Sequence, residues 1–455
     1  MTTTNSERAC ALKAQPVAGI YVHIPFCARK CLYCDFLSFD KWNSSMQAEY
    51  ARALLSEIRS GGNGVCARAL SGSSSQRRPA ADTVFIGGGT PSLFPQEYIE
   101  EILETLRETF EIAEDAEITI EANPGTLTKE KLSAYRRFGI NRLSMGVQSF
   151  DDRLLARLGR VHSAAEAMET YKLARRCGFE NINLDLMFAL PGQTEEMWRR
   201  TLETAAELSP EHISFYSLQL EENTPFFEMF CRGEIEQIPD DIDRGMYHRA
   251  IAFLKASGYG HYEISNAAKP GYECRHNLKY WSMEDYFGFG LGASGFVGGV
   301  RYSNLRDFGE YCRAAVAGGD RNTDRWIQNS DVEIFDCDSR KVRHCSETVK
   351  DTDSAKLVCR NVPAVDKGTA AELHENTAYD NESEYIFTGL RKTAGIDLCD
   401  FSARFGRELE QDAAVQRYIA SGHMELLKRP ADGHVFLRFT ENGIDISNGI
   451  LADII

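Results

Sequence analysis

Three cysteines, Cys27, Cys31 and Cys34, stand at spacings of four and three residues. They follow an apolar run, residues 19–24, that predicts a short buried strand, so the three thiols come from one loop at the end of a strand. Three thiolates can hold three corners of an iron–sulfur cube and leave one iron without a protein ligand. A small molecule can bind at that open iron.

Two other uses of these cysteines remain open. The loop could hold a structural zinc ion with His23 as fourth ligand, although zinc sites more often contain two C-x-x-C pairs. Disulfides are disfavoured, because the chain has 13 cysteines, an odd number, scattered through 455 residues without a secretory signal. The same features indicate a reducing, cytoplasmic compartment.

Composition excludes several other classes of protein. The chain is 43% hydrophobic and 26% charged, as expected for a globular protein that buries a large core. Its net charge of −16 argues against nucleic acid as the main partner. No apolar run approaches the roughly 18 residues that a membrane-spanning helix needs, so no membrane span is predicted.

From residue 19 to about 300, predicted strands alternate with predicted helices. Six strand–helix repeats indicate an α/β fold with a parallel sheet, either open or curved into a partial barrel, in which ligands collect at the carboxyl ends of the strands. Polar or glycine residues stand at successive strand ends, namely the three cysteines, Gly87 to Thr90, Glu121, Gln148 and Asp185. The sequence therefore predicts one site at that edge.

These residue types suit an organic ligand with several polar groups. The glycines let backbone approach a ligand closely, and strand-edge N–H and C=O groups could bind its amino and carboxylate groups. Carboxylates such as Glu121 and Asp185 can accept from hydroxyl or ammonium groups, and Arg160 can fork onto a carboxylate. Each of these residues, taken alone, could equally be an ordinary solvated or capping residue. Their shared position with the cysteines at the strand ends is what indicates a ligand site.

The remaining segments complete the predicted organisation. Residues 1–18 form an N-terminal tail, and residues 19–325 form the barrel with an extension, interrupted by a flexible Gly/Ser-rich insert at 60–80. Residues 326–380 are polar without a sustained period and predict a mobile insert. Residues 381–455 predict helices and a hairpin, a small winged-helix-like domain ending in one helix over 444–455.

Several motifs resemble the radical S-adenosylmethionine (SAM) family of oxygen-independent coproporphyrinogen III oxidases, and within it the branch of HemW-type heme chaperones. The C-x-x-x-C-x-x-C spacing is its hallmark. The resemblance covers residues 19–325 apart from the 60–80 insert, covers 381–455 more loosely, and does not cover 1–18 or 328–378. The matching segments are 21–27 (YVHIPFC), 85–93 (FIGGGTPSL), 120–125 (IEANPG), 142–150 (RLSMGVQSF), 158–162 (LGRVH), 183–193 (NLDLMFALPGQ), 272–281 (YECRHNLKYW) and 450–455 (ILADII).

The resemblance implies a radical SAM partial (β/α)6 barrel with a [4Fe-4S] cluster on Cys27, Cys31 and Cys34 and SAM on the fourth iron. An electron donor must then reduce the cluster, and in the family this reduction cleaves SAM to a 5′-deoxyadenosyl radical. The family's SAM contacts fall on Tyr21, Tyr33, Gly88, Gly89, Thr90, Glu121, Gln148, Arg160 and Asp185.

Departures from the oxidases favour the chaperone branch. The oxidases carry a fourth cysteine two residues after the third, where this chain has Phe36, and a longer segment before the triad than the 26 residues present here. The resemblance thus implies a heme carrier that passes heme to an acceptor protein. The alternative is an oxidase that converts coproporphyrinogen III to protoporphyrinogen IX.

A second motif, H-N-x-x-Y-W, comprises His276, Asn277, Tyr280 and Trp281, and the resemblance implies a role in heme handling. A neutral imidazole is a good axial ligand for heme iron, and the two aromatic rings offer flat apolar faces. Alternatively, His276 hydrogen-bonds a backbone carbonyl and the aromatics fill core. Rival ligands are His162, His261 and Cys274. Relatives often carry histidine where this chain has Ser294.

Overall fold

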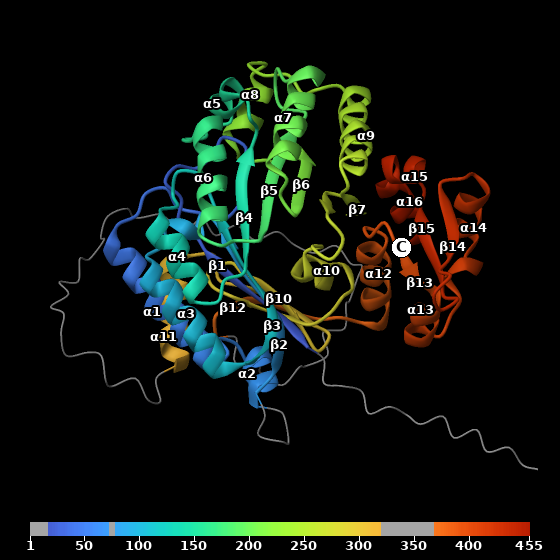
Figure 1. The fold of residues 1–455 in the computed structure, drawn as a ribbon. Coiled ribbons are helices and arrows are strands. Elements are labelled where there is room, and N and C mark those ends of the chain that lie inside the picture. The colour runs from blue at the N-terminus through green and yellow to red at the C-terminus, as the bar shows by residue number, and fades with distance from the viewer. Residues whose placement is uncertain (1–16, 72–77, 320–367) are drawn as a thin grey trace, which may run out of the picture.

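One large sheet organises the structure, a computed structural model that describes residues 17–71, 78–319 and 368–455 (Figure 1). Its 12 strands run in the order β12-β11-β10-β9-β1-β2-β3-β4-β5-β6-β8-β7. Six neighbours that pair in parallel and in chain order form its centre. They are β1 (Ala18–Ile24), β2 (Ala80–Gly88), β3 (Glu111–Ala122), β4 (Arg142–Gln148), β5 (Asn181–Phe188) and β6 (His212–Ser217). The predicted α/β fold, a partial (β/α)6 barrel, is confirmed.

Helices between these strands cover the outer face of the barrel (Figure 1). Their apolar stripes supply the core. Helix α1, for example, buries Tyr50, Leu54 and Ile58 completely, and the Asn43 side chain caps its first turn. The connecting helices are α1 (Ser44–Ser60), α2 (Gly64–Ser71), η1 (Pro91–Leu93), α3 (Gln96–Thr109), α4 (Lys129–Arg137), α5 (Asp152–Arg157), α6 (Ala164–Arg176) and α7 (Glu195–Leu208).

An extension continues the sheet at both edges. Strand β9 pairs in parallel with β1, so that Tyr21 lies beside Gly288, and β8 pairs antiparallel with β6. The extension comprises α8 (Pro225–Cys231), α9 (Asp240–Ala256), β7 (Gly260–Glu263), β8 (Asn266–Ala268), α10 (Arg275–Trp281), β9 (Tyr286–Phe289), β10 (Ser294–Val297), β11 (Val300–Asn304), α11 (Phe308–Gly319) and β12 (Ala370–Glu375).

The C-terminal part has its own small core beside α10 and β7 (Figure 1). Its three-stranded sheet, in the order β13-β15-β14, contains the predicted hairpin. Backbone bonds join it to the barrel extension, from Ile264 N to Arg391 O (3.2 Å) and from Thr393 N to Tyr262 O (3.0 Å). The elements are α12 (Ala378–Gly389), β13 (Ile396–Asp397), α13 (Leu398–Phe405), η2 (Leu409–Gln411), α14 (Ala413–Ala420), β14 (Met424–Lys428), β15 (Val435–Phe439), α15 (Glu441–Asp445) and α16 (Ser447–Ile454).

Three local expectations differ from the structure. Residues 64–71 of the supposed flexible insert form helix α2, which Asn63 caps and which buries Cys66 against the Tyr302 hydroxyl. Residues 370–375 form the edge strand β12, because they pair with β11 although their sequence is polar. The single final helix is two helices, separated at Ile446. The remaining parts of the predicted tail and inserts, residues 1–16, 72–77 and 320–367, lie outside the described residues.

None of the helices in the described ranges has the length and hydrophobicity that a membrane span requires.

Candidate functional site

The three cysteines lie on the loop between β1 and α1 and line one cavity of about 390 Å³. Backbone bonds close the base of the loop, from Cys27 N to Phe39 O (2.8 Å) and from Phe39 N to Pro25 O (2.7 Å). Another bond, from Leu32 N to Leu158 O (3.1 Å), fastens its tip to the end of α5. The loop therefore presents all three thiols to the carboxyl ends of the strands, as predicted.

The surroundings of His23 do not favour the zinc alternative. Its Nε2 donates to Leu37 O (2.9 Å) and its Nδ1 accepts from the Tyr21 hydroxyl (3.0 Å), so both ring nitrogens are occupied. Within the described ranges, the only three His, Cys, Asp or Glu side chains whose ligand atoms all lie within 4.8 Å of one another are Asp397, Cys399 and His434. The three cysteine sulfurs do not meet this limit. Thiolates on one zinc ion lie about 4 Å apart, given Zn–S bonds of about 2.3 Å. The thiol triad is spaced more widely than a single ion requires.

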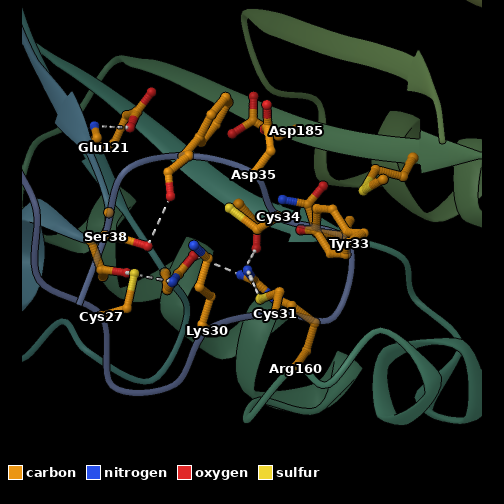
Figure 2. Close-up of a pocket in the computed structure, with 18 of the residues that line it drawn as sticks. Cys27, Lys30, Cys31, Tyr33, Cys34, Asp35, Ser38, Glu121, Arg160 and Asp185 are labelled. Carbon is orange, nitrogen blue, oxygen red and sulfur yellow. Dashed lines mark hydrogen bonds between the residues drawn. The ribbon is translucent and has the colours of Figure 1, made fainter. Parts of the chain in front are cut away.

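The cysteine cavity gathers almost all residues expected to contact SAM (Figure 2). Figure 2 shows the cysteine loop with Arg160 on one side of the cavity and the carboxylates of Glu121 and Asp185 toward the other. Tyr21 is the exception, since it lines a neighbouring cavity. The expected residues that line the cysteine cavity are Tyr33, Gly88, Gly89, Thr90, Glu121, Gln148, Arg160 and Asp185.

The glycine turn contributes shape rather than free amide groups. Gly88 N donates to Glu121 Oε2 (3.0 Å), and the amides of Gly89 and Thr90 donate to Ile24 O (2.9 Å) and Phe26 O (2.8 Å). The expectation that strand-edge N–H groups bind the ligand is therefore wrong for these three residues. A Cβ on Gly89 would lie 3.0 Å from the Cys27 sulfur, so only glycine lets the turn approach the thiol this closely.

Two half-buried carboxylates, those of Glu121 and Asp185, line the cavity. Burial and the nearby Asp185 raise the pKa of Glu121 to about 8. Burial also raises the pKa of Asp185, although the hydrogen bond from Asn183 acts to lower it. Two such carboxyl groups disfavour each other's ionisation, so a cationic group in the cavity would stabilise both as carboxylates. SAM carries an ammonium and a sulfonium group and meets this requirement.

Strand β4 ends in a strained turn that directs Gln148 into the cavity. Gln148 has φ 66°, in the left-handed region that non-glycine residues rarely adopt, and the pairing with β5 shifts register there. The Tyr216 hydroxyl donates to Gln148 Oε1 (2.9 Å). Because this bond occupies the amide oxygen, the amide nitrogen is left to donate to a ligand.

The sequence-based prediction missed Asn123 and Tyr216, which also line the cavity. Both carried a detectable signal. Asn123 stands two residues after Glu121, directly beyond the end of β3. Tyr216 stands next to the last residue of β6, at the carboxyl end of a strand where the site is predicted.

A second cavity, of about 580 Å³, adjoins the first and shares Asp35, Phe36, Gly88 and Glu121 with it. We call it the aromatic cavity, because six aromatic residues line it, namely Tyr21, Phe36, Tyr280, Trp281, Tyr286 and Phe296. Ser294, Arg301 and Arg306 line it as well.

The H-N-x-x-Y-W motif divides between this cavity and the core. Tyr280 and Trp281 line the cavity, whereas His276 and Asn277 do not. His276 is 1% exposed. Its Nδ1 bonds the Thr83 hydroxyl (2.8 Å) and its Nε2 bonds the Tyr280 hydroxyl (2.7 Å). Burial lowers the pKa of His276 to about 3, so the ring is neutral.

The rival ligands also lie away from both cavities. The Nε2 atoms of His162 and His261 bond the carbonyl oxygens of Val147 (3.2 Å) and Ile264 (3.3 Å). The Cys274 thiol donates to Glu117 Oε1 (3.5 Å).

Comparisons with known proteins agree with this geometry. Residues 21–205 match the model of the radical SAM superfamily. The heme chaperone HemW of Bacillus subtilis is 34% identical over 391 residues, which make up 86% of this chain and 87% of that protein. HemW of Escherichia coli is 42% identical over 283 residues, 62% of this chain and 71% of that protein.

Among solved structures, coproporphyrinogen III oxidase (HemN) from Escherichia coli superposes with a TM-score of 0.72 at 20% sequence identity. The match covers 97% of this chain and 90% of that one. At this identity the likeness establishes the fold.

Proposed function

Because the chain belongs to the HemW family of heme chaperones within the radical SAM superfamily, we propose that it binds heme and passes it to an acceptor protein. The observation that carries the proposal is the aromatic cavity of about 580 Å³ beside the cysteine cavity.

Membership of the radical SAM superfamily implies a [4Fe-4S] cluster and SAM. We assign the cluster to Cys27, Cys31 and Cys34, whose thiols share one cavity. The residues fit this assignment, because the turn at Gly89 leaves room beside the Cys27 sulfur that a Cβ would fill. A reduced cluster supplies one electron to SAM when both are bound.

The chain's own residues would hold SAM by its polar ends. Glu121 and Asp185 supply carboxylates for its cationic and hydroxyl groups, and Gln148 supplies an amide donor. The Arg160 guanidinium supplies a positive charge near its carboxylate and can donate one N–H to it, because its Nη2 hydrogens are already used on Asn123 and Gly146.

The aromatic cavity suits heme in size, and its lining holds two arginines beside the carboxylates of Asp35, Glu121 and Glu284. Its volume lies within the range of about 300–1,000 Å³ that is usual for cofactor sites. Tyr280, Trp281 and Phe296 contribute aromatic surface that a flat macrocycle could contact. Arg306 is an exposed arginine that lines the cavity and can meet a heme propionate. Arg301 is already paired with Glu384 (2.6 Å).

The arrangement of the motif supports an indirect role for His276. Both of its ring nitrogens are bonded inside the protein, and its ring stands edge-on to that of Tyr280, with centroids 5.0 Å apart. We assign His276 to positioning Tyr280 at the cavity wall, and we assign the contact with heme to Tyr280 and Trp281.

A hemin titration followed by absorbance tests the proposal. Replacement of Trp281 by Ala should weaken hemin binding about tenfold, because the loss of a stacked aromatic face costs about 1.5 kcal/mol. Phe230→Ala is the matched control, since Phe230 is an exposed ring (41%) outside both cavities.

Arg306→Ala should also weaken binding, whereas Arg313→Ala, at an exposed arginine on α11 outside both cavities, should not. Wild-type affinity in both Trp281→Ala and Arg306→Ala would exclude this cavity as the heme site. In a parallel anaerobic assay with coproporphyrinogen III, SAM and reductant, formation of protoporphyrinogen IX would favour the oxidase alternative instead.

A further inference from the structure

A chain of hydrogen bonds joins two of the cysteine thiols through Asn123. The Thr90 hydroxyl donates toward the Cys27 sulfur (3.7 Å), and Arg160 Nη1 donates toward the Cys31 sulfur (3.5 Å). Asn123 lies between these two donors. Its Nδ2 donates to Thr90 Oγ1 (2.9 Å), and its Oδ1 accepts from Arg160 Nη2 (2.6 Å).

The directions of these bonds follow from the chemistry of the groups. Arginine can only donate, so the amide oxygen of Asn123 must face Arg160 and its NH₂ group must face Thr90. Because Thr90 Oγ1 then accepts from Asn123, the hydroxyl hydrogen is free to point at the Cys27 sulfur. One amide thus orients both donors.

Asn123 itself is held in place. Its backbone N–H donates to Ser92 Oγ (3.4 Å), and its backbone carbonyl accepts from Thr126 Oγ1 (2.7 Å). A proline follows it in the sequence. Glycine at position 146 leaves room for the Asn123 side chain, since a Cβ there would lie 2.8 Å from Asn123 Oδ1. Arg160 also donates to the Gly146 carbonyl, so this series of hydrogen bonds links the ends of β2, β3 and β4.

We propose that Asn123 is a positioning residue that sets the reduction potential and the retention of a cluster held by these thiols. Hydrogen bonds to ligating sulfurs stabilise the more negative, reduced state and so raise the potential. Groups that orient metal ligands from outside typically change metal affinity by about 10–100-fold when they are removed. By aligning two such donors at once, Asn123 affects two of the three ligands.

The test uses full-length protein that is reconstituted anaerobically and measured without SAM. An EPR-monitored redox titration gives the midpoint potential, and the rate of iron loss to a chelator gives retention. Asn123→Ala should shift the potential to more negative values and speed iron loss about tenfold. Asn141→Ala is the matched control, because Asn141 also makes two hydrogen bonds, to Ala116 O and from Ile118 N, at the opposite ends of the strands.

Thr90→Val removes the hydrogen bonds that link Asn123 to the Cys27 sulfur, while it preserves the shape of the side chain. If Asn123 acts through Thr90, the double variant should shift the potential by less than the sum of the single shifts. Asn123→Ser provides the same measurements should the alanine variant take up no cluster. Wild-type potential and iron loss in the Asn123 variants, or strictly additive shifts with Thr90→Val, would overturn the proposal.

Discussion

Replacement of His276 by Ala should destabilise the protein strongly while leaving the mode of heme coordination unchanged. The buried imidazole of His276, on α10, links this helix to β2. It bonds Thr83 on one side and Tyr280 on the other, and it stacks on Phe85 with ring centroids 5.3 Å apart.

The expected loss follows from these contacts. Two buried hydroxyl groups, those of Thr83 and Tyr280, would lose their partners, at about 1 kcal/mol each. Truncation of a fully buried ring adds about 2–3 kcal/mol from lost burial and the resulting cavity. The free energy of unfolding should therefore fall by about 4–5 kcal/mol. This is a large share of the 5–15 kcal/mol typical of a protein domain.

Two measurements separate the structural role from ligation. Denaturant unfolding of the protein without heme gives the loss of stability, with His374→Ala, at an exposed histidine, as a control expected within about 0.5 kcal/mol of wild type. The absorption spectrum of bound heme reports its axial ligands and should keep its band positions in His276→Ala. Wild-type stability together with a changed spectrum would refute the structural role and establish His276 as a heme ligand.

Three further predictions concern the cysteine cavity and the core behind it. Burial raises the pKa of Glu121 to about 8, so between about pH 4.5 and 8 the folded protein keeps a proton that the unfolded chain releases. The free energy of unfolding therefore falls as the pH rises through this range. Glu121→Gln should flatten that part of the profile of denaturation midpoint against pH. Glu57 is buried and accepts from Tyr311 and from Gly290 N (2.7 Å), so Glu57→Ala should cost about 3 kcal/mol or more in denaturant unfolding by stranding its donors. Gly89→Ala should reduce iron and sulfide content after reconstitution, whereas Gly449→Ala, with open space at its Cβ, should not.

The strand ends made most of the cysteine cavity predictable. Strand boundaries are local features, because an apolar run followed by a turn marks them. Parallel pairing then brings the carboxyl ends together at one edge. Glu121, Gln148 and Asp185 could therefore be assigned to the same site as the cysteines without knowledge of any contact between them.

The position of Tyr21 depended on a neighbour that is remote in sequence. The cavity that Tyr21 lines is formed in part by residues of α10 and β9, more than 250 residues later in the chain. His276 shows the same limit. Its spacing from Tyr280 places both on one face of a helix, but no local pattern reveals that Thr83 occupies the other ring nitrogen. Strand β12 escaped prediction because its polar residues pair only at an edge.

The parallel pairing of β1 with β9 affects how the protein is made. About 260 residues separate the end of β1 from the start of β9, and ribosomes add about 5–20 residues per second. One side of β1 therefore waits on the order of 10–50 s for its partner during synthesis, and the adjoining cysteine loop remains without its complete surroundings for that time. During that time the three thiols are more exposed to oxidants than they are in the folded protein.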